Sequence, residues 1–164
     1  MPWHFKYQLG RMKNTELINK QLNRLLTLNC KAEKAFLDVI DIVDSTVIKN
    51  FLRVSGYERK QFIKALDSAI RQKGGVPTYP DNIIPSLNKN KLRQIISKRN
   101  KLKILTEIGR MQVVDIEKYQ KVLNNVDFPE QLEKALKNQK NTIVNSLYGI
   151  EVHKDLFARQ FAVS

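Results

Sequence analysis

The stretch that decides the fold runs from Ser45 to Pro77 and reads STVIKNFLRVSGYERKQFIKALDSAIRQKGGVP. Its apolar residues recur at alternating steps of three and four, which predicts one long amphipathic helix. Ser45 is a suitable N-cap, and the pair Gly74-Gly75 followed by Pro77 ends the helix. The spacing predicts a buried seam made of Ile48, Phe51, Ser55, Glu58, Phe62, Ala65 and Ala69. This seam places a carboxylate, that of Glu58, toward the middle of the protein.

The same periodicity predicts three further helices, over about residues 15–43, 88–124 and 129–149. Short turns join the helices into two antiparallel hairpins, and about residues 74–87 form a long crossover connection between the hairpins. We therefore expect an all-α protein, a ferritin-like four-helix bundle that spans residues 14–150. Residues 1–13 form an N-terminal extension and residues 151–164 a C-terminal tail.

The composition of the chain indicates its cellular location and the kind of partner it favours. The 164 residues carry a formal net charge of +13, which favours anionic partners. No apolar run approaches the roughly 20 residues of a membrane-spanning helix, and the N-terminus does not resemble a secretory signal. The single cysteine, Cys30, lies beside apolar helical positions, which indicates a buried thiol in a reducing compartment. We expect a cytoplasmic protein without a membrane span.

Each expected helix interrupts its apolar seam at about the same height. Glu58, Gln112 and Gln139 lie at similar distances from the turns of their hairpins, and Asn29 and Glu33 bracket that level on the helix over 15–43. Buried polar groups need hydrogen-bond partners, so these five residues predict a hydrogen-bonded polar layer in the core. If Glu33 and Glu58 approach each other without a cation, their ionisation is coupled.

In ferritin-like carboxylate bundles such a layer holds two metal ions, bound by a Glu from each of two helices and a Glu-x-x-His pair from each of the other two. The segments at 58–61 and 139–142 read ERKQ and QKNT and contain no histidine. The two histidines, His4 and His153, lie outside the expected bundle. We therefore expect no cofactor and no di-iron or di-manganese centre, and Glu33 and Glu58 remain the weak metal-ligand candidates.

Several short runs resemble one family. They are KAEKAF at 31–36, ERKQF at 58–62, GGVP at 74–77, EIGRMQ at 107–112 and NQK at 138–140. Over roughly residues 14–147 the chain resembles the bacterial ferritin-like four-helix-bundle family known as a domain of unknown function. The resemblance implies a ferritin-like bundle but no established activity and no catalytic residues.

The chain also departs from that family pattern. The family tends to have acidic residues where Gly109 and Gln112 stand, and an aromatic Gly-Tyr pair where Ala35-Phe36 stands. The resemblance therefore implies a divergent member with degenerate di-metal positions.

Two classes of function fit these observations, and no catalytic motif accompanies them. The first is a non-catalytic bundle that acts through protein association, with a second copy of itself or with another protein. The second is binding of nucleic acid or another polyanion by a basic surface. The candidate residues for that surface are Lys89, Lys91, Arg93, Lys98, Arg99, Lys101 and Lys103. A third hypothesis is residual metal binding at Glu33 and Glu58, and an enzyme would have to use these same two carboxylates.

Overall fold

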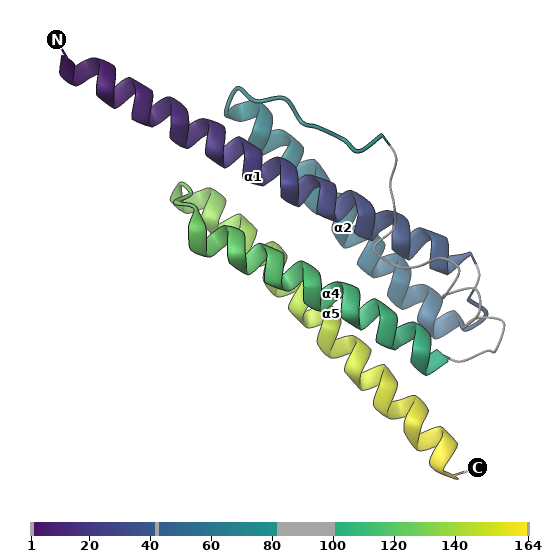
Figure 1. Cartoon of the computed structure of the whole chain (residues 1–164). Helices are drawn as coiled ribbons and strands as arrows, with labels where there is room; N and C mark the ends of the chain where they lie inside the picture. The colour runs from purple at the N-terminus through teal and green to yellow at the C-terminus, as the bar shows by residue number, and fades with distance from the viewer. Residues whose placement is uncertain (1, 42, 82–100, 164) are drawn as a thin grey trace.

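The computed structural model describes residues 2–41, 43–81 and 101–163, and within them the chain is all-α. Its helices are α1 (Pro2–Ile40), α2 (Thr46–Gln72), α4 (Lys101–Asn125) and α5 (Glu130–Val163). Helix α1 packs along α2, α4 packs along α5, and the two hairpins lie face to face (Figure 1). Within these ranges, the prediction of an all-α protein whose helices pair in two hairpins is confirmed. No helix in these three ranges has both the length and the apolar character needed to cross a bilayer.

Helix α2 begins and ends where its sequence predicts. The hydroxyl of Ser45 accepts a hydrogen bond from the backbone amide of Ile48 at 3.4 Å, which caps the first turn. At the other end Gly74 has a φ of 75°, and the amide of Gly75 donates to the carbonyl of Ile70 at 2.9 Å. Glycine is favoured at such a left-handed position because it has no Cβ.

The outer ends of the two longest helices differ from the expected boundaries. Helix α1 begins at Pro2 rather than near residue 15, and α5 continues to Val163 rather than ending near 149. These ends extend past the neighbouring helices at opposite ends of the bundle (Figure 1). The part of α5 just past residue 149 still packs on the bundle, since Ile150 is buried in the core and the ring of His153 contacts Phe51. The expected helix over 88–100 and crossover residues 82–87 lie outside the described part of the chain.

The buried side of α2 differs by one residue from the expected seam. Its buried residues are Ile48, Leu52, Ser55, Gly56, Arg59, Ile63, Leu66 and Ile70. Arg59, and not Glu58, therefore points into the core. Ile48 and Ser55 of the predicted seam are buried, and the placement of Glu58 on the buried seam was wrong. The backbone of Gly56 packs beside Phe36 of α1, where an added Cβ would lie 3.6 Å from the Cβ of Phe36, an ordinary van der Waals distance. Phe51 and Phe62 are only partly buried at the edge of the core.

The apolar core consists of two clusters, one toward each end of the bundle. One contains Phe36, Leu52 and Leu105, and the other contains Leu22, Leu66 and Leu136. Buried polar residues occupy the level between them: Asn29, Ser55, Arg59, Gln112, Asp115 and Gln139. The bundle is thus divided at mid-height by a polar level.

Replacing Gly74 with alanine should lower the free energy of unfolding by about 1 kcal/mol, because a residue with a Cβ is strained in the left-handed region. Among the described residues no atom lies within 4 Å of the added Cβ, so the cost is conformational and not steric. Asparagine tolerates this conformation better, so Gly74→Asn should cost less. Urea denaturation of both variants measures the difference, and equal losses would contradict this explanation of the helix end.

Candidate functional site

A hydrogen-bonded group of polar side chains from all four helices lies between the two apolar clusters, and we call it the polar core. Its members are Asn29, Ser55, Arg59, Gln112, Asp115, Tyr119, Gln139 and Ser146. Helices α4 and α5 contribute five of these eight side chains. The group connects both hairpins and is the most polar part of the described interior.

Arg59 is the centre of the polar core. Its guanidinium donates to Asn29 Oδ1 at 3.0 Å and to Gln112 Oε1 at 2.6 Å. Arg59 Nη1 also lies 3.0 Å from Asp115 Oδ2, and only 2% of the side chain is exposed. Asp115 Oδ2 makes no hydrogen bond of regular geometry within the described residues, so its contact with Arg59 is chiefly electrostatic. One buried cation therefore links α2 to α1 and α4.

Two chains of hydrogen bonds lead from Arg59 to α5. Asn29 Nδ2 donates to the hydroxyl of Tyr119 at 2.7 Å, and that hydroxyl donates to Gln139 Oε1 at 2.7 Å. Gln112 Nε2 donates to Ser146 Oγ at 2.7 Å. Each amide turns its oxygen toward the cation and its nitrogen away from it. The positive charge of Arg59 thus sets the direction of both chains.

Burial shifts the ionisation of two groups in the polar core. Burial raises the pKa of Asp115 above its ordinary value of 3.8, while the nearby charges of Arg59 and Lys118 oppose the rise. Burial also raises the pKa of Tyr119, so its phenol stays protonated and can donate. The guanidinium of Arg59 and the phenol of Tyr119 thus both serve as hydrogen-bond donors between helices.

The structure brings together three of the five residues expected in the polar layer: Asn29, Gln112 and Gln139. Glu33 and Glu58 are half-buried and lie outside the hydrogen-bonded group. Burial raises the pKa of Glu58 and the charge of Arg59 opposes it, whereas Glu33 is not among the causes of the shift. The coupled ionisation expected for a close pair of acids therefore has no support.

The residues that sequence reasoning missed carried a weak signal. Arg59 continues the spacing of Leu52 and Ile63 on α2, and Asp115 and Tyr119 stand one turn apart on α4. A charged residue is rare at a core position, so sequence periodicity favours the neighbouring stripe of α2 that runs through the apolar Phe51 and Phe62.

Metal-binding chemistry has little support among these side chains. In the described ranges no group of three or more His, Cys, Asp or Glu is placed to hold a metal ion. His153, expected outside the bundle, lies on α5 and packs edge-on against Phe51, with ring centroids 5.6 Å apart. Burial raises the pKa of Cys30, so it is a thiol and a poor metal ligand. Among the described residues, Glu33 and Glu58 therefore belong to no such group of three.

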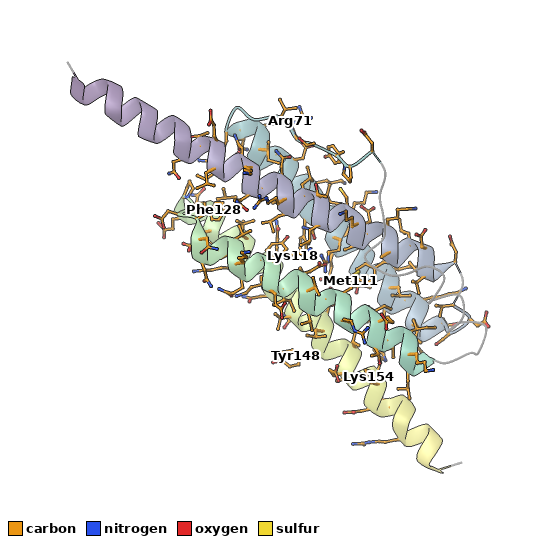
Figure 2. The ribbon with its side chains drawn as sticks, in the orientation of Figure 1. Arg71, Met111, Lys118, Phe128, Tyr148 and Lys154 are labelled. Atoms are coloured by element: carbon orange, nitrogen blue, oxygen red, sulfur yellow. The ribbon has the colours of Figure 1, made fainter. Side chains whose placement is uncertain are left out.

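An open groove lies between α1 and α4, beside the polar core, and we call it the α1–α4 groove. Its volume is about 720 Å³. Five basic side chains line it: Lys20, Arg24, Lys31, Lys118 and Lys121. Four apolar side chains line it too: Leu25, Leu28, Val122 and Val126. The one acidic side chain in the lining is Asp115, which is held by Arg59. Figure 2 marks Lys118 on the side of α4 that faces α1.

The segment after α2 runs beside α1 at the edge of this groove. Asn23 Nδ2 donates to the carbonyl of Val76 at 3.3 Å, and the amide of Thr78 donates to Asn23 Oδ1 at 2.8 Å. Asn19 Nδ2 reaches the carbonyl of Lys73 at 3.5 Å, and Tyr79 donates to Asp67. These contacts fix the segment, and Thr78 becomes part of the groove lining. The segment therefore forms one edge of the groove through Thr78.

The groove cations are a different set from the basic residues singled out in the sequence. Lys89, Lys91, Arg93, Lys98 and Arg99 lie outside the described residues. Lys101 begins α4, and Lys103 is exposed in its first turn. The sequence did contain one sign that these lysines border the core, because Lys118 and Lys121 flank the buried Tyr119 and Val122. Only the pairing of α4 with α1 turns these separate lysines into one basic surface.

Replacing Arg59 with methionine should lower the free energy of unfolding by about 3–5 kcal/mol, because the change leaves Asp115 buried without its cation. The matched control is Arg53→Met, an exposed site on the same helix, which should change stability by no more than about 0.5 kcal/mol. Urea denaturation measures both. Similar values for the two variants would exclude a central role for the buried guanidinium.

The destabilisation caused by Arg59→Met should grow as the pH rises from about 4 to about 7. Without Arg59 the pKa of Asp115 rises further, because burial then acts with only Lys118 to oppose it. A carboxyl group with a raised native pKa stabilises the fold below its unfolded pKa, and this contribution is lost as the pH rises through the native pKa. Denaturation curves at several pH values test the slope, and a pH-independent difference would contradict it.

Comparison with known proteins adds one finding. A family model described as "Domain of unknown function (DUF2383)" matches residues 18–125, which include Asn29, Arg59, Gln112 and Asp115. No curated protein and no solved structure matches the chain. Since the match extends over well more than half of the chain, this protein belongs to the family Domain of unknown function (DUF2383).

Proposed function

We propose that this protein is a non-catalytic helical bundle that binds an acidic, amphipathic helix of a partner protein in the α1–α4 groove. The observation that carries the proposal is the composition of the groove, which combines an apolar lining with five basic side chains. A partner helix with one apolar face and flanking carboxylates would match both features. The groove is the recognition surface, and the polar core holds the helices that form it.

Charge is the first line of support. The groove cations come from both helices, Lys20, Arg24 and Lys31 from α1 and Lys118 and Lys121 from α4. The acid in the lining, Asp115, is already paired with Arg59 and does not neutralise them. Complementary charge speeds encounter and excludes partners of the same sign. The net charge of +13 adds to this attraction at longer range.

The dimensions of the groove support a helix as the occupant. Lys20 and Lys31 stand three turns apart on α1, roughly 16 Å at a rise of about 1.5 Å per residue. Leu25 and Leu28 lie within this span, and Val122 and Val126 face them from α4. An amphipathic helix places its own apolar residues at matching steps of three and four when it lies in such a groove.

A nucleic acid is the alternative occupant, and the lining favours it less. Phosphate contacts need only cations, whereas four apolar aliphatic side chains form the floor of this groove, although each of them is at most 8% exposed. Base stacking needs aromatic side chains, and the lining contains none in the described residues. Binding of a nucleic acid or another polyanion is therefore the competing result that the binding experiment below distinguishes.

The non-catalytic part of the proposal is supported by the occupants of the mid-bundle level. Amides, hydroxyls and the Arg59–Asp115 pair fill the position where a ferritin-like bundle would carry metal-binding carboxylates. The proposal also includes a ferritin-like affiliation of the fold. It further includes a location in the reducing cytoplasm, because Cys30 is a buried free thiol. Residual metal binding at Glu33 and Glu58 is less well supported.

The test uses a fluorescent synthetic peptide held helical by a side-chain cross-link, with leucines on one face and glutamates beside them. Fluorescence anisotropy should show binding that weakens with salt. The combined change Lys31→Glu and Lys118→Glu should weaken binding by roughly tenfold or more. The matched control, Lys60→Glu with Lys64→Glu on α2, changes the net charge equally and should have a much smaller effect.

Two further comparisons decide between occupants. A peptide of the same composition with its leucines spread around the helix should bind more weakly, because it cannot cover the apolar lining. A single-stranded oligonucleotide should compete poorly. If the oligonucleotide binds more tightly than the peptide and loses affinity with the groove variants, the groove serves a polyanion and the proposal is wrong. Equal binding by the groove and control variants would exclude the groove altogether.

A further inference from the structure

The exposed side of α2 carries four cations and a tyrosine, and we call it the α2 basic face. Its members are Lys49, Arg53, Tyr57, Lys60 and Lys64. They follow one another at steps of four, four, three and four residues, so they lie on successive turns along one face of the helix. Lys49 is partly exposed, and the other four side chains are exposed. At a rise of about 1.5 Å per residue, the face extends over roughly 22 Å.

The cations of this face form two pairs of like charge. Lys49 and Arg53 are four residues apart, and so are Lys60 and Lys64. Like charges at this spacing destabilise a helix. Within the described residues, none of these four cations forms an ion pair with a carboxylate. The stability of the helix alone would favour an acid in each pair, so the face is better suited to an anionic partner.

The surfaces of the other described helices differ from this face. Each of these helices pairs at least one surface cation with an acid about one turn away. On α2 the one such pair in the described residues, Arg71 with Asp67 at 2.8 Å, lies beyond the basic face at the C-terminal end, where Figure 2 marks Arg71. The pairs on the other helices include Lys34–Asp38 at 3.6 Å, Arg110–Glu107 at 3.1 Å and Lys137–Glu133 at 3.6 Å.

Tyr57 stands between the two cation pairs, one turn after Arg53 and one turn before Lys60. Its side chain is 64% exposed, so the ring is accessible to a stacking partner. A single strand of nucleic acid presents both groups that this pattern fits, phosphates for the cations and unstacked bases for the aromatic ring. A duplex keeps its bases inside the stack, and an acidic peptide has no base.

We propose that the α2 basic face binds single-stranded nucleic acid. The cation pair on either side of Tyr57 contacts phosphates, and a base stacks on the ring between them. The two cations of a pair are about 6 Å apart along the helix axis, so each pair reaches neighbouring phosphates of one strand. The net charge of +13 attracts the strand at longer range. Contacts of this kind are largely independent of base sequence.

This face is separate from the α1–α4 groove. The groove is lined by α1, α4 and the segment after α2, so among the described residues the two surfaces share no side chain. A strand bound to α2 leaves the groove open to a partner helix. The proposal therefore does not depend on the proposed function of the groove.

Fluorescence anisotropy of a short labelled single-stranded oligonucleotide is the first test. The logarithm of its affinity for the full chain should fall with the logarithm of the salt concentration with a slope of about −3, as four phosphate contacts require. Lys60→Glu with Lys64→Glu should weaken binding by roughly tenfold or more and flatten this slope. The matched control is Lys134→Glu with Lys137→Glu, both exposed on α5, which changes the net charge equally and should have a much smaller effect.

Three results of this experiment would overturn the proposal. They are the absence of binding at low salt, equal effects of the α2 and α5 variants, and loss of binding in the groove variant Lys31→Glu with Lys118→Glu but not in the α2 variant. The last result would assign the strand to the groove. Circular dichroism of each variant controls for folding.

The stacking contact is tested by Tyr57→Ala, which should weaken oligonucleotide binding by roughly fivefold or more. Tyr148→Ala on α5, where the side chain is 67% exposed, is the matched control and should leave binding unchanged. Inorganic polyphosphate has phosphates but no bases, so it should bind the Tyr57→Ala variant and the unchanged chain equally. If Tyr57→Ala has no effect, or weakens polyphosphate binding to the same extent, the face does not recognise a base and the proposal is wrong.

Discussion

A buried guanidinium needs partners on every side, and this need organises the bundle around Arg59. The cation contacts Asn29 on α1 and Gln112 and Asp115 on α4, while its own backbone belongs to α2. Hydrogen bonds then pass from Asn29 and Gln112 to α5. A shift of any helix along its axis would separate at least one of these partners from the charge. The apolar clusters above and below supply most of the burial, but the polar core fixes the register between the hairpins.

The polar core and the α1–α4 groove are parts of one structure. Asp115 binds Arg59 on its inner side and also lines the groove, and the carbonyl of Leu25 accepts from Asn29 while its side chain lines the same groove. Lys118 belongs to the groove and acts on the ionisation of Asp115. A partner carboxylate near Lys118 would therefore change the electrostatic environment of the buried Arg59–Asp115 pair. The inside of the bundle and the α1–α4 groove share residues rather than merely lying close.

The two faces where the hairpins meet have opposite characters. The face between α1 and α4 is open and basic, with a volume of about 720 Å³. The face between α2 and α5 is closed by Phe51, which packs against His153 and fills the space left by Gly149.

The sequence by itself determined the helical fold, because apolar periodicity, the Ser45 cap and the Gly74-Gly75 stop are local signals that need no neighbour. It also placed Asn29, Gln112 and Gln139 at one height, since helix rise converts residue number into position. Which of Glu58 and Arg59 faces inward was decided only by tertiary structure. Two adjacent stripes on α2 are almost equally apolar, and the partners that Arg59 finds on α1 and α4 allow the stripe with the charged residue to be buried. The groove depended on tertiary structure even more, because its five cations come from two helices that the sequence separates by nearly the whole bundle.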